Sequence, residues 1–468
     1  MRRLKHSGIY WCLNCNVPLL DSECEICRVK GEFVPLSRPV DPKPAFRFDL
    51  NLLHQTISQE FGVDAANFLL KNVEVAVFNR VPYLDKGYEV LVDGRILGHL
   101  FFDFPRLYWR FKPLREGCSR LWVKKLGFWV VVNNGFVAKN QILGELDFLE
   151  KNLPEKEGGY VFLVSKKDEV LGVGELTDKG KVYVLRVWKP EQPRFLNFKA
   201  SWNQVVKANF SKLKTDISKA CKFIGDISSR LKLPVFVSYS GGKDSLTTLY
   251  LTVKASCKTK ILFNDTGLEL PETLENADWV ASKFGVEILK VKAEEAFWIH
   301  LKDFGPPTRE NRWCSKVCKL KPTAKFLDEK IGENKILCFV GQRKAESFRR
   351  AGSRKIWVNK FLPKIVASSP INDWSMLQVW LCLMMERLDG YVNKLYFEGF
   401  DRIGCFMCPS MEMADLLVVK KRYPILWERW EKELENWILN KNLPRQWIDY
   451  GLWRWKNPPK RILDKIGG

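Results

Sequence analysis

Short apolar runs and longer amphipathic stretches alternate along the second half of the chain. Each run has the length and β-branched content of a buried strand, and the amphipathic stretches after the first two are typical of helices. The runs are Val235–Tyr239, Lys260–Asn264, Val286–Val291 and Lys335–Val340, with helices predicted to about Ser256 and over Pro271–Phe284. Strands and helices in regular alternation predict an α/β fold, built as a doubly wound parallel sheet.

The first half of the chain has a β-rich pattern between residues 120 and 192. Strand runs are separated by turns that carry Asn or Gly. The runs are Phe128–Val132, Tyr160–Val164, Val170–Gly174 and Lys181–Leu185, and the turns are Asn133–Gly135, Gly158–Gly159 and Asp178–Gly180. Short strands with regular turns predict a small closed or pseudo-barrel sheet.

Helical and hairpin patterns flank this region. Residues 45–118 combine a predicted helix, Leu50–Asn72, with a hairpin whose turn is Asp93-Gly94. We expect His54 and His99 to be packed or hydrogen-bonded rather than catalytic. One amphipathic helix is predicted over residues 200–230, from the apolar spacing of Val206, Phe210, Leu213, Ile217, Cys221 and Ile224.

The excess of basic over acidic residues narrows the class of molecule that the chain is expected to bind. The 468 residues include 76 Lys and Arg against 54 Asp and Glu, a net charge of +22. Half of this excess lies between Arg309 and Lys364, which hold 16 Lys and Arg against 5 Asp and Glu. We therefore expect this basic segment to bind a polyanion, RNA or nucleotide, with a solvated basic face as the alternative. Without a leader or a bilayer-length apolar stretch, the chain is expected to be soluble and cytoplasmic, with no membrane partner.

Four of the thirteen cysteines form two Cys-x-x-Cys pairs near the start of the chain: Cys12, Cys15, Cys24 and Cys27. This spacing can supply the four thiolates of a closed tetrahedral zinc site, with a rubredoxin-like iron as the alternative. A segment this small cannot bury a core of its own, so metal binding would supply its folding energy.

The apolar run at Val235–Tyr239 breaks into Ser240-Gly241-Gly242-Lys243-Asp244-Ser245. Paired glycines between a strand and a helix let backbone N–H groups face a bound anion, and the lysine adds positive charge. The spacing is not that of the kinase P-loop, which has four residues between its glycines. The string resembles the PP-loop of the ATP pyrophosphatase (adenine nucleotide α-hydrolase) superfamily, Ser-Gly-Gly-x-Asp-Ser, at all five specified positions.

Further strings resemble the phosphoadenosine phosphosulfate (PAPS) reductase branch of that superfamily. Phe263-Asn-Asp-Thr-Gly-Leu-Glu-Leu-Pro-Glu-Thr273 is similar to its Asp-Thr-Gly-x-x-x-Pro-Glu-Thr stretch. Gly341-Gln-Arg-Lys-Ala-Glu-Ser-Phe-Arg349 resembles its Gly-x-Arg-x-x-Glu-Ser-x-x-Arg motif. Ser369-Pro-Ile-Asn-Asp-Trp374 and Asn393-Lys-Leu-Tyr-Phe-Glu-Gly399 follow in family order, the latter with Lys in place of Pro.

This resemblance implies an ATP site. The loop Ser240–Ser245 would hold the β- and γ-phosphates that leave as pyrophosphate, and Asp244 or Asp265 would help hold Mg²⁺. Arg343 and Arg349 would stabilise charge at the α-phosphate. The predicted catalytic residues are Lys243, Asp244, Arg343 and Arg349, and the other predicted nucleotide-binding residues are Ser240, Gly241, Gly242, Ser245, Asp265, Thr266, Gly267, Gly341 and Glu346.

A second cysteine set, Cys314, Cys318, Cys405 and Cys408, includes a Cys-x-x-Cys-Pro string. Four thiolates suit a [4Fe–4S] cluster or zinc. Relatives in this branch with such a pair bind [4Fe–4S] beside the nucleotide, and this favours iron–sulfur over zinc or free thiols. The first pair is spaced Cys-x₃-Cys, not adjacent as in adenylyl-sulfate reductases, so the cluster type stays open.

The β-rich strings of residues 120–192 resemble the PUA domain, which binds structured RNA in RNA-modifying enzymes. The sequence therefore predicts a zinc-ribbon-like knuckle at 1–34, an α+β region at 45–118, a PUA-like β-barrel at 120–192, a linking helix at 200–230, a PP-loop domain at 231–411 and a helical extension at 412–468.

Two reactions of the superfamily compete. Adenylyl-sulfate reductases deliver a nucleophilic cysteine from a Glu-Cys-Gly-x-His tail, and no cysteine follows Cys408 in this sequence. ATP-dependent sulfur transfer to a base of tRNA or rRNA uses the PP-loop, lets the cluster carry sulfur from a donor and explains the basic excess. The sequence favours sulfur transfer, with the reductase and a non-catalytic RNA-binding protein as alternatives.

Overall fold

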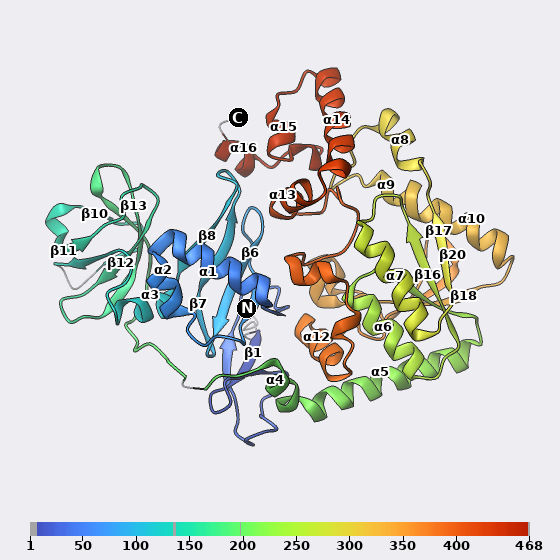
Figure 1. Ribbon diagram of the computed structural model, residues 1–468, viewed down its shortest axis with the longest axis horizontal. Coiled ribbons are helices and arrows are strands. Elements are labelled where there is room, and N and C mark those ends of the chain that lie inside the picture. Colours follow the sequence, from blue (N-terminus) through green and yellow to red (C-terminus); the bar gives the residue numbers. More distant parts are fainter. Residues whose placement is uncertain (1–6, 134–136, 197, 467–468) are drawn as a thin grey trace. The chain divides into compact units, whose positions relative to one another are not determined.

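The computed structural model describes residues 7–133, 137–196 and 198–466 (Figure 1). Its chain divides into two compact units. The first unit comprises Met1–Asp103 and Tyr108–Phe210, and the second comprises Phe104–Leu107 and Ser211–Gly468. The short segment Phe104–Leu107 belongs to the second unit, where the ring of Phe104 packs 6.0 Å from that of Tyr450, centroid to centroid.

The first unit begins with a three-stranded antiparallel sheet in the order β2-β1-β3. Its strands are β1 (Gly8–Cys12), β2 (Val17–Leu19) and β3 (Glu32–Pro35). Cys12 ends β1, Cys15 lies in the turn to β2, and Cys24 and Cys27 lie in the loop before β3. The two predicted ligand pairs are therefore carried by the two connections of one small sheet.

A five-stranded antiparallel sheet follows, in the order β4-β5-β6-β7-β8. Its strands are β4 (Lys43–Pro44), β5 (Val77–Arg80), β6 (Gly87–Val92), β7 (Arg95–Asp103) and β8 (Tyr108–Pro113). The predicted hairpin is confirmed: Asp93 and Gly94 join β6 to β7 with φ values of +53° and +69°. A two-residue hairpin turn needs positive φ at both positions, which Asp and Gly tolerate.

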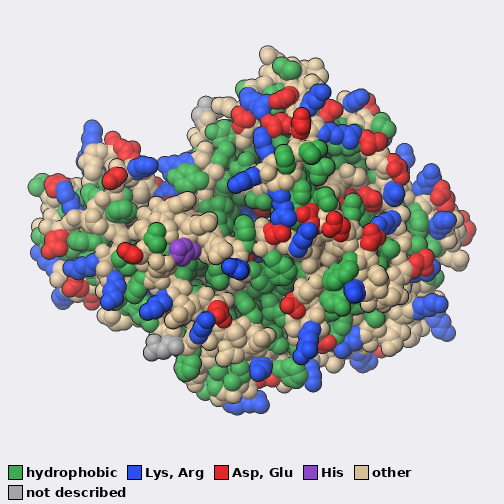
Figure 2. Space-filling view, viewed as in Figure 1, with side chains coloured by type: hydrophobic (Ala, Val, Ile, Leu, Met, Phe, Trp, Pro, Cys, Tyr) green, Lys and Arg blue, Asp and Glu red, His purple; other side chains and the backbone are tan. Residues whose placement is uncertain are grey.

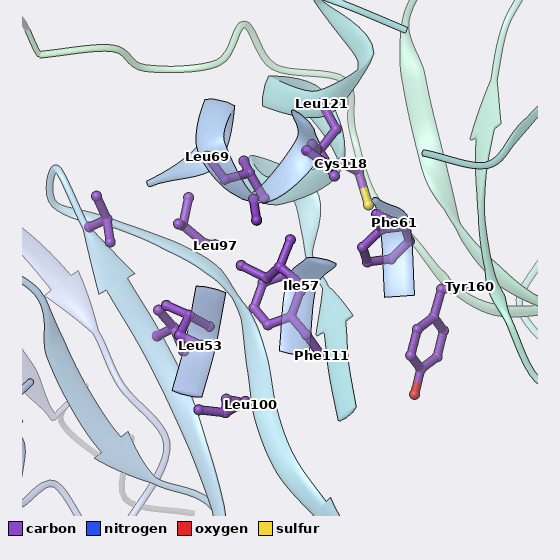
Figure 3. Packing of buried hydrophobic residues seen from close by; sticks show 14 of the residues in the cluster. Leu53, Ile57, Phe61, Leu69, Leu97, Leu100, Phe111, Cys118, Leu121 and Tyr160 are labelled. Atoms are coloured by element: carbon purple, nitrogen blue, oxygen red, sulfur yellow. The ribbon is translucent and has the colours of Figure 1, made fainter. Parts of the chain in front are cut away.

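Helices α1 (Arg47–Phe61), α2 (Val63–Leu69) and α3 (Arg115–Trp122) share one core with this sheet. Figure 3 shows Leu53 and Ile57 of α1 beside Leu100 and Phe111 of the strands. The prediction of a single helix over Leu50–Asn72 was wrong. The chain breaks at Gly62, whose φ of +92° lies outside the helical region.

The β-rich region forms a six-stranded mixed sheet in the order β10-β14-β13-β12-β9-β11. Its strands are β9 (Trp129–Val132), β10 (Ile142–Leu143), β11 (Phe148–Asn152), β12 (Tyr160–Val164), β13 (Val170–Leu176) and β14 (Val182–Val187). Strands β12 and β9 pair in parallel and the other neighbours are antiparallel. In the described residues β10 and β11 end the strand order without closing it, so the PUA-like barrel is not confirmed. Residues 134–136 of the predicted turn lie outside the described residues.

The predicted linking helix is two helices, α4 (Trp202–Ala208) and α5 (Phe210–Leu231). Asn209 separates them, because its side chain serves tertiary partners: its Oδ1 accepts from the Leu20 N–H at 2.6 Å and its Nδ2 donates to the Pro18 carbonyl at 3.0 Å. The predicted apolar stripe is correct at Leu213, Ile217 and Ile224, which are buried. Phe210 is 40% exposed and does not join the core.

The second unit is built on a six-stranded sheet in the order β17-β16-β15-β18-β20-β19. Its strands are β15 (Val235–Tyr239), β16 (Thr259–Asp265), β17 (Ile288–Lys292), β18 (Ile336–Val340), β19 (Ile356–Asn359) and β20 (Leu362–Ser368). All neighbours are parallel except β19 and β20. The predicted parallel α/β sheet is confirmed, and its near-continuous apolar strands reflect burial on both faces.

Helices connect these strands and extend beyond them. The connecting helices include α6 (Lys243–Lys254), α7 (Pro271–Phe284), α8 (Ala296–Phe304), α10 (Lys321–Lys330) and α12 (Met376–Met385). The C-terminal helices are α13 (Met413–Arg422), α14 (Pro424–Lys441), α15 (Gln446–Asp449) and α16 (Lys460–Ile466). No helix in the described part of the chain is long and apolar enough to cross a membrane.

Candidate nucleotide and cysteine site

The loop Ser240–Ser245 leaves β15 and passes directly into α6. Strand β15 lies between β16 and β18, where the strand order reverses, and such switch points are the usual ligand sites of open α/β sheets. Gly241 has φ +72°, and a Cβ there would lie 2.7 Å from Thr273 Cγ2. Glycine is therefore required for both its backbone conformation and its lack of a side chain.

Three charged side chains meet at this loop. Asp244 accepts from Lys243 Nζ at 2.8 Å and from Arg343 Nε at 2.7 Å. Arg343 is 1% exposed, so its charge depends on this carboxylate. Burial would raise the pKa of Asp244, but Arg343 and Lys243 hold it below its usual value. The cluster carries one net positive charge, as a site for a polyphosphate requires.

Gly341 brings Arg343 to this position. It follows β18, and a Cβ there would lie 2.5 Å from the carbonyl carbon of Asp244 and 2.6 Å from the backbone nitrogen of Ser245. The end of β18 can therefore approach the start of α6 only without a side chain. Glu346 accepts from the backbone N–H of Arg343 at 3.2 Å, so it supports the arginine rather than facing the loop directly.

The predicted Arg349 lies in the short helix α11 (Phe348–Ala351), and its side chain lies outside the described residues. Counted along Gly-x-Arg-x-x-Glu-Ser-x-x-Arg from Gly341, the second arginine of the motif is Arg350. Its guanidinium pairs with Glu346. Burial lowers the pKa of Arg350, and the charge of Arg402 acts in the same direction. The second arginine position of the motif is therefore Arg350 and not the predicted Arg349.

Two buried residues at the loop were absent from the predicted site. The Tyr396 hydroxyl accepts from the backbone N–H of Lys243 at 3.3 Å, and Lys243 Nζ lies 5.4 Å from the centre of the Tyr396 ring. Asn393 donates to Thr273 Oγ1 at 3.3 Å. Both residues stand in the string Asn393–Gly399, so the signal was present in the sequence, but the resemblance gave no role to a single residue of that string.

The second predicted loop follows β16, the neighbour of β15. Asp265 Oδ1 accepts from the Gly267 N–H at 3.0 Å, and Thr266 Oγ1 donates to Glu269 at 2.8 Å. Carboxyl ends of adjacent parallel strands meet at one edge of the sheet, so this loop and Ser240–Ser245 share that edge. In this structure Asp265 caps its own turn.

The second cysteine set is attached to the loop after β16. Cys405 Sγ lies 3.6 Å from Thr266 Oγ1, and the Phe406 N–H donates to the Leu268 carbonyl at 2.8 Å. Cys314 lies in α9 (Trp313–Ser315), and Cys318 lies in the π-helical turn Lys316–Leu320 that follows it. Single π turns within helices often occur at functional sites.

The four thiols of this set influence one another electrostatically. Burial raises the pKa of Cys314 to about 11, and the charges of Cys408 and Cys318 add to the rise. Burial likewise raises the pKa of Cys318 and of Cys405 to about 12. Cys314, Cys318 and Cys405 are therefore protonated at neutral pH unless a metal displaces the protons.

The two cysteine sets differ in their fit to metal. The sulfurs of Cys12, Cys15, Cys24 and Cys27 lie within 4.8 Å of one another. A tetrahedral ion with Zn–S bonds of 2.3 Å would hold its sulfurs about 3.8 Å apart, so this set fits one ion. Within the described ranges no other group of His, Cys, Asp or Glu is as close. The second set is not among the close groups, and its residues could hold either zinc or an iron–sulfur cluster.

Many cations of the basic segment Arg309–Lys364 already have carboxylate partners. Lys344 and Lys355 both lie 2.8 Å from Asp373, and Arg309 lies 3.1 Å from Glu412. On the face in Figure 2, Lys and Arg side chains are interspersed with Asp and Glu. The expected excess of charge is real, but part of it is neutralised locally, so the segment is a less open cationic track than its sequence indicated.

Comparison with known proteins assigns this region to a family. The model of the phosphoadenosine phosphosulfate reductase domain matches residues 234–411. The protein MJ0066 of Methanocaldococcus jannaschii is 38% identical over 471 residues, which is 96% of this chain and 96% of that protein. The adenosine 5′-phosphosulfate reductase of Salinibacter ruber is 23% identical over 182 residues, 37% of this chain and 67% of that enzyme.

Among solved structures, the U34-tRNA thiolase NcsA from Methanococcus maripaludis, determined with its [4Fe-4S] cluster, is 16% identical. The likeness covers 48% of this chain and 80% of that chain, with a TM-score of 0.31. A score this low adds nothing to the assignment that the family model makes.

Proposed function

The chain belongs to the family of Methanocaldococcus jannaschii MJ0066 and carries a PAPS reductase domain of the PP-loop superfamily, and from this premise we propose that it transfers sulfur to an RNA base at the expense of ATP. The contact between the Cys405 loop and the Thr266 loop carries this proposal. A thiol set attached to the edge of the sheet that bears the nucleotide loop is what sulfur chemistry on an adenylated substrate requires.

The reaction has two displacements. A carbonyl oxygen of the base attacks the α-phosphorus of ATP, the bond to the β-phosphate breaks, and pyrophosphate leaves with the electron pair. A sulfur at the oxidation level of hydrosulfide then attacks the base carbon, and AMP leaves with the original oxygen. The products are a thiocarbonyl, AMP, pyrophosphate and one proton, so no external reductant is consumed.

The chain's own residues have separable roles in the first displacement. Backbone N–H groups of Ser240–Ser245 and the ammonium of Lys243 bind the β- and γ-phosphates. Arg343 is preorganised by Asp244 to stabilise charge that develops at the α-phosphate. Asp244 is ionised and can contribute an oxygen ligand to Mg²⁺ bound by the phosphates.

The cysteines serve the second displacement. A [4Fe–4S] cluster on Cys314, Cys318, Cys405 and Cys408 would carry the incoming sulfur when bound. The N-terminal set would hold zinc and stabilise its own small sheet. The proposed partners are a tRNA or rRNA and a sulfur donor, and the six-stranded sheet of the first unit is the proposed PUA-like RNA module.

A second candidate is reduction of adenylyl sulfate. The likeness to the Salinibacter ruber adenosine 5′-phosphosulfate reductase favours it over part of the chain. Such an enzyme would release sulfite and AMP and would need a thiol reductant, but no ATP cleavage or RNA. A non-catalytic RNA-binding protein would form neither set of products.

Product analysis distinguishes these candidates. Anaerobically purified protein is incubated with ATP, bulk RNA and sulfide, and separately with adenylyl sulfate and a dithiol. We expect AMP and pyrophosphate that depend on RNA, and one thionucleoside missing from the RNA of cells that lack the gene. Sulfite from adenylyl sulfate, with a complete set of thionucleosides in those cells, would replace this proposal by the reductase.

A further inference from the structure

A cavity of about 400 Å³ lies within the first unit and includes no residue of the nucleotide loop. Its volume is in the range of small-molecule sites. Four segments line it: Glu32–Pro35 of β3, Gly94–Ile96 at the start of β7, Leu114–Glu116 at the start of α3, and Arg186–Trp188 at the end of β14. Its walls therefore come from the knuckle, the five-stranded sheet and the six-stranded sheet together.

Hydrogen-bond donors exceed acceptors around this cavity. Arg95 Nε and Trp188 Nε1 are buried and have no hydrogen-bond partner. The ion pairs of Arg95 are long, at 3.5 Å to Glu191 and 3.9 Å to Glu32. Arg186 is exposed at the end of β14 and has no carboxylate partner in the described ranges.

The carboxylates at the cavity do not cancel this excess. Glu32 accepts from Arg194 at 2.8 Å. Glu116 accepts from Arg120 Nε and from the Arg194 backbone N–H, both at 2.8 Å. Their charges are therefore shared with other cations, so that Arg95 is only weakly paired and Arg186, without a carboxylate partner in the described ranges, can face an incoming anion.

Flat apolar surface lies beside these cations. The lining includes the rings of Phe33 and Trp188 and the side chain of Val187, of which Phe33 is 37% and Val187 40% exposed. Unstacked bases are bound on aromatic rings and guanidinium planes, with phosphate held by arginine. We propose that this cavity binds a single nucleotide, with the base against Phe33 and Trp188 and the phosphate at Arg95 and Arg186.

Two probes test the proposal on the full-length protein: AMP, and a fluorescein-labelled uridine octanucleotide. The full-length Lys243→Ala variant is the background for every measurement, because loss of this ammonium weakens binding at the nucleotide loop, so that the binding that remains reports a second site. We expect Arg186→Ala to raise the dissociation constant about fivefold and Arg95→Met about tenfold, because each removes charged donors from the phosphate. Arg47→Ala, an exposed arginine of α1, is the matched control and should change nothing.

Each outcome decides the proposal. Binding of both probes with this pattern of variants indicates a site for free nucleotides, and binding of the octanucleotide alone indicates one position of an RNA strand. Absence of binding, or variants that behave like Arg47→Ala, would overturn it. If Arg95→Met lowers the melting temperature, the dissociation constant of Arg186→Ala decides the test, because Arg186 is exposed. Sulfur transfer is measured in a separate assay. A failure to transfer sulfur would not contradict nucleotide binding in this cavity, and a failure to bind nucleotide in the cavity would not contradict sulfur transfer.

Discussion

The nucleotide loop is assembled by close backbone packing at Gly341, a position where a side chain would not fit. Gly341 allows the end of β18 to approach the backbone of Asp244, and that approach aligns Arg343 with the carboxylate. A substitution at Gly341 is therefore expected to displace Arg343 without changing the charge of the site.

We expect Gly341→Ala to lower ATP cleavage on the order of 10²-fold, because misplacement of a catalytic group by about 1 Å has that effect. Gly352→Ala is the matched control, since no atom lies within 4 Å of a Cβ there and its φ is −91°. Initial rates of pyrophosphate release measure both variants. Equal rates would show that the loop tolerates displacement.

Removal of the Lys243 side chain should lower pyrophosphate release as strongly as Gly341→Ala does, but through the loss of a charge. We expect Lys243→Ala to lower pyrophosphate release by 10² or more, as loss of a preorganised charged group usually does. Lys254→Ala, in the last turn of the same helix, should keep its rate. The products identify the chemistry: ADP and orthophosphate in place of AMP and pyrophosphate would contradict the PP-loop mechanism.

The buried side chain of His99 should make the free energy of unfolding of the first unit depend on pH. Burial lowers the pKa of His99 from 6.5 to about 3, and the charges of Lys112 and Arg186 add to the effect. The unfolded chain therefore binds the proton first as pH falls. The contribution of His99 is complete above pH 6.5 and is lost between pH 6.5 and 3, by about 5 kcal/mol in total.

His99→Gln should flatten this part of the stability curve, because glutamine can keep a hydrogen bond to Tyr83 without titrating. His54→Gln is the control, since His54 bonds Asn67 in an exposed position. Urea unfolding at pH 7, 5.5 and 4 gives the comparison. A slope unchanged by His99→Gln would show that carboxylates alone set the pH dependence.

At the scale of elements, the two cysteine sets belong to different kinds of structure. The N-terminal set is held by connections of a sheet with three short strands, which has little core of its own. The second set joins a π-helical turn to a loop fastened to the parallel sheet. Metal loss should therefore have different consequences at the two places.

We expect Cys12→Ser to release one zinc ion per chain and to unfold the first sheet while the α/β unit stays folded, because metal binding provides much of the folding energy of such a module. Cys405→Ser should instead abolish a brown, oxygen-sensitive chromophore and sulfur transfer. Cys118→Ser, a fully buried thiol outside both sets, is the control for metal content. Two zinc ions and no colour in anaerobic protein would make the second set structural.

At the scale of the molecule, the net charge of +22 sets the expected response to salt. Ion pairs made by Lys344, Lys355 and Lys364 reduce the number of cations in the segment Arg309–Lys364 that are available to RNA. Arg354 and Lys360 have no carboxylate partner in the described residues. They are therefore better candidates for phosphate contacts than Lys344 or Lys355.

Binding to bulk tRNA should weaken steeply as salt rises, because each neutralised phosphate releases counterions. We expect Arg354→Ala and Lys360→Ala each to reduce the slope of log K against log salt by about 0.7 to 0.9, equally for all RNAs. Lys71→Ala, on an exposed turn of the first unit outside the six-stranded sheet, is the comparison. Binding that does not respond to salt would exclude a polyphosphate backbone as the ligand.

The sequence predicted the parallel sheet, the nucleotide loop and the cysteine pairs, because each is encoded by contiguous residues. A strand run such as Val235–Tyr239 or a Gly-Gly turn is specified by local pattern and backbone sterics. The hairpin at Asp93-Gly94 was predicted for the same reason.

Only the tertiary structure decided what depends on partners distant in the chain. Asn209 ends α4 because it bonds residues 189 and 191 positions away, and no local pattern contains those partners. The same holds for the hydroxyl of Tyr396 on the Lys243 backbone and for the Cys405 loop against Thr266. Local propensity fixes which elements form, whereas the contacts between elements fix which side chains meet.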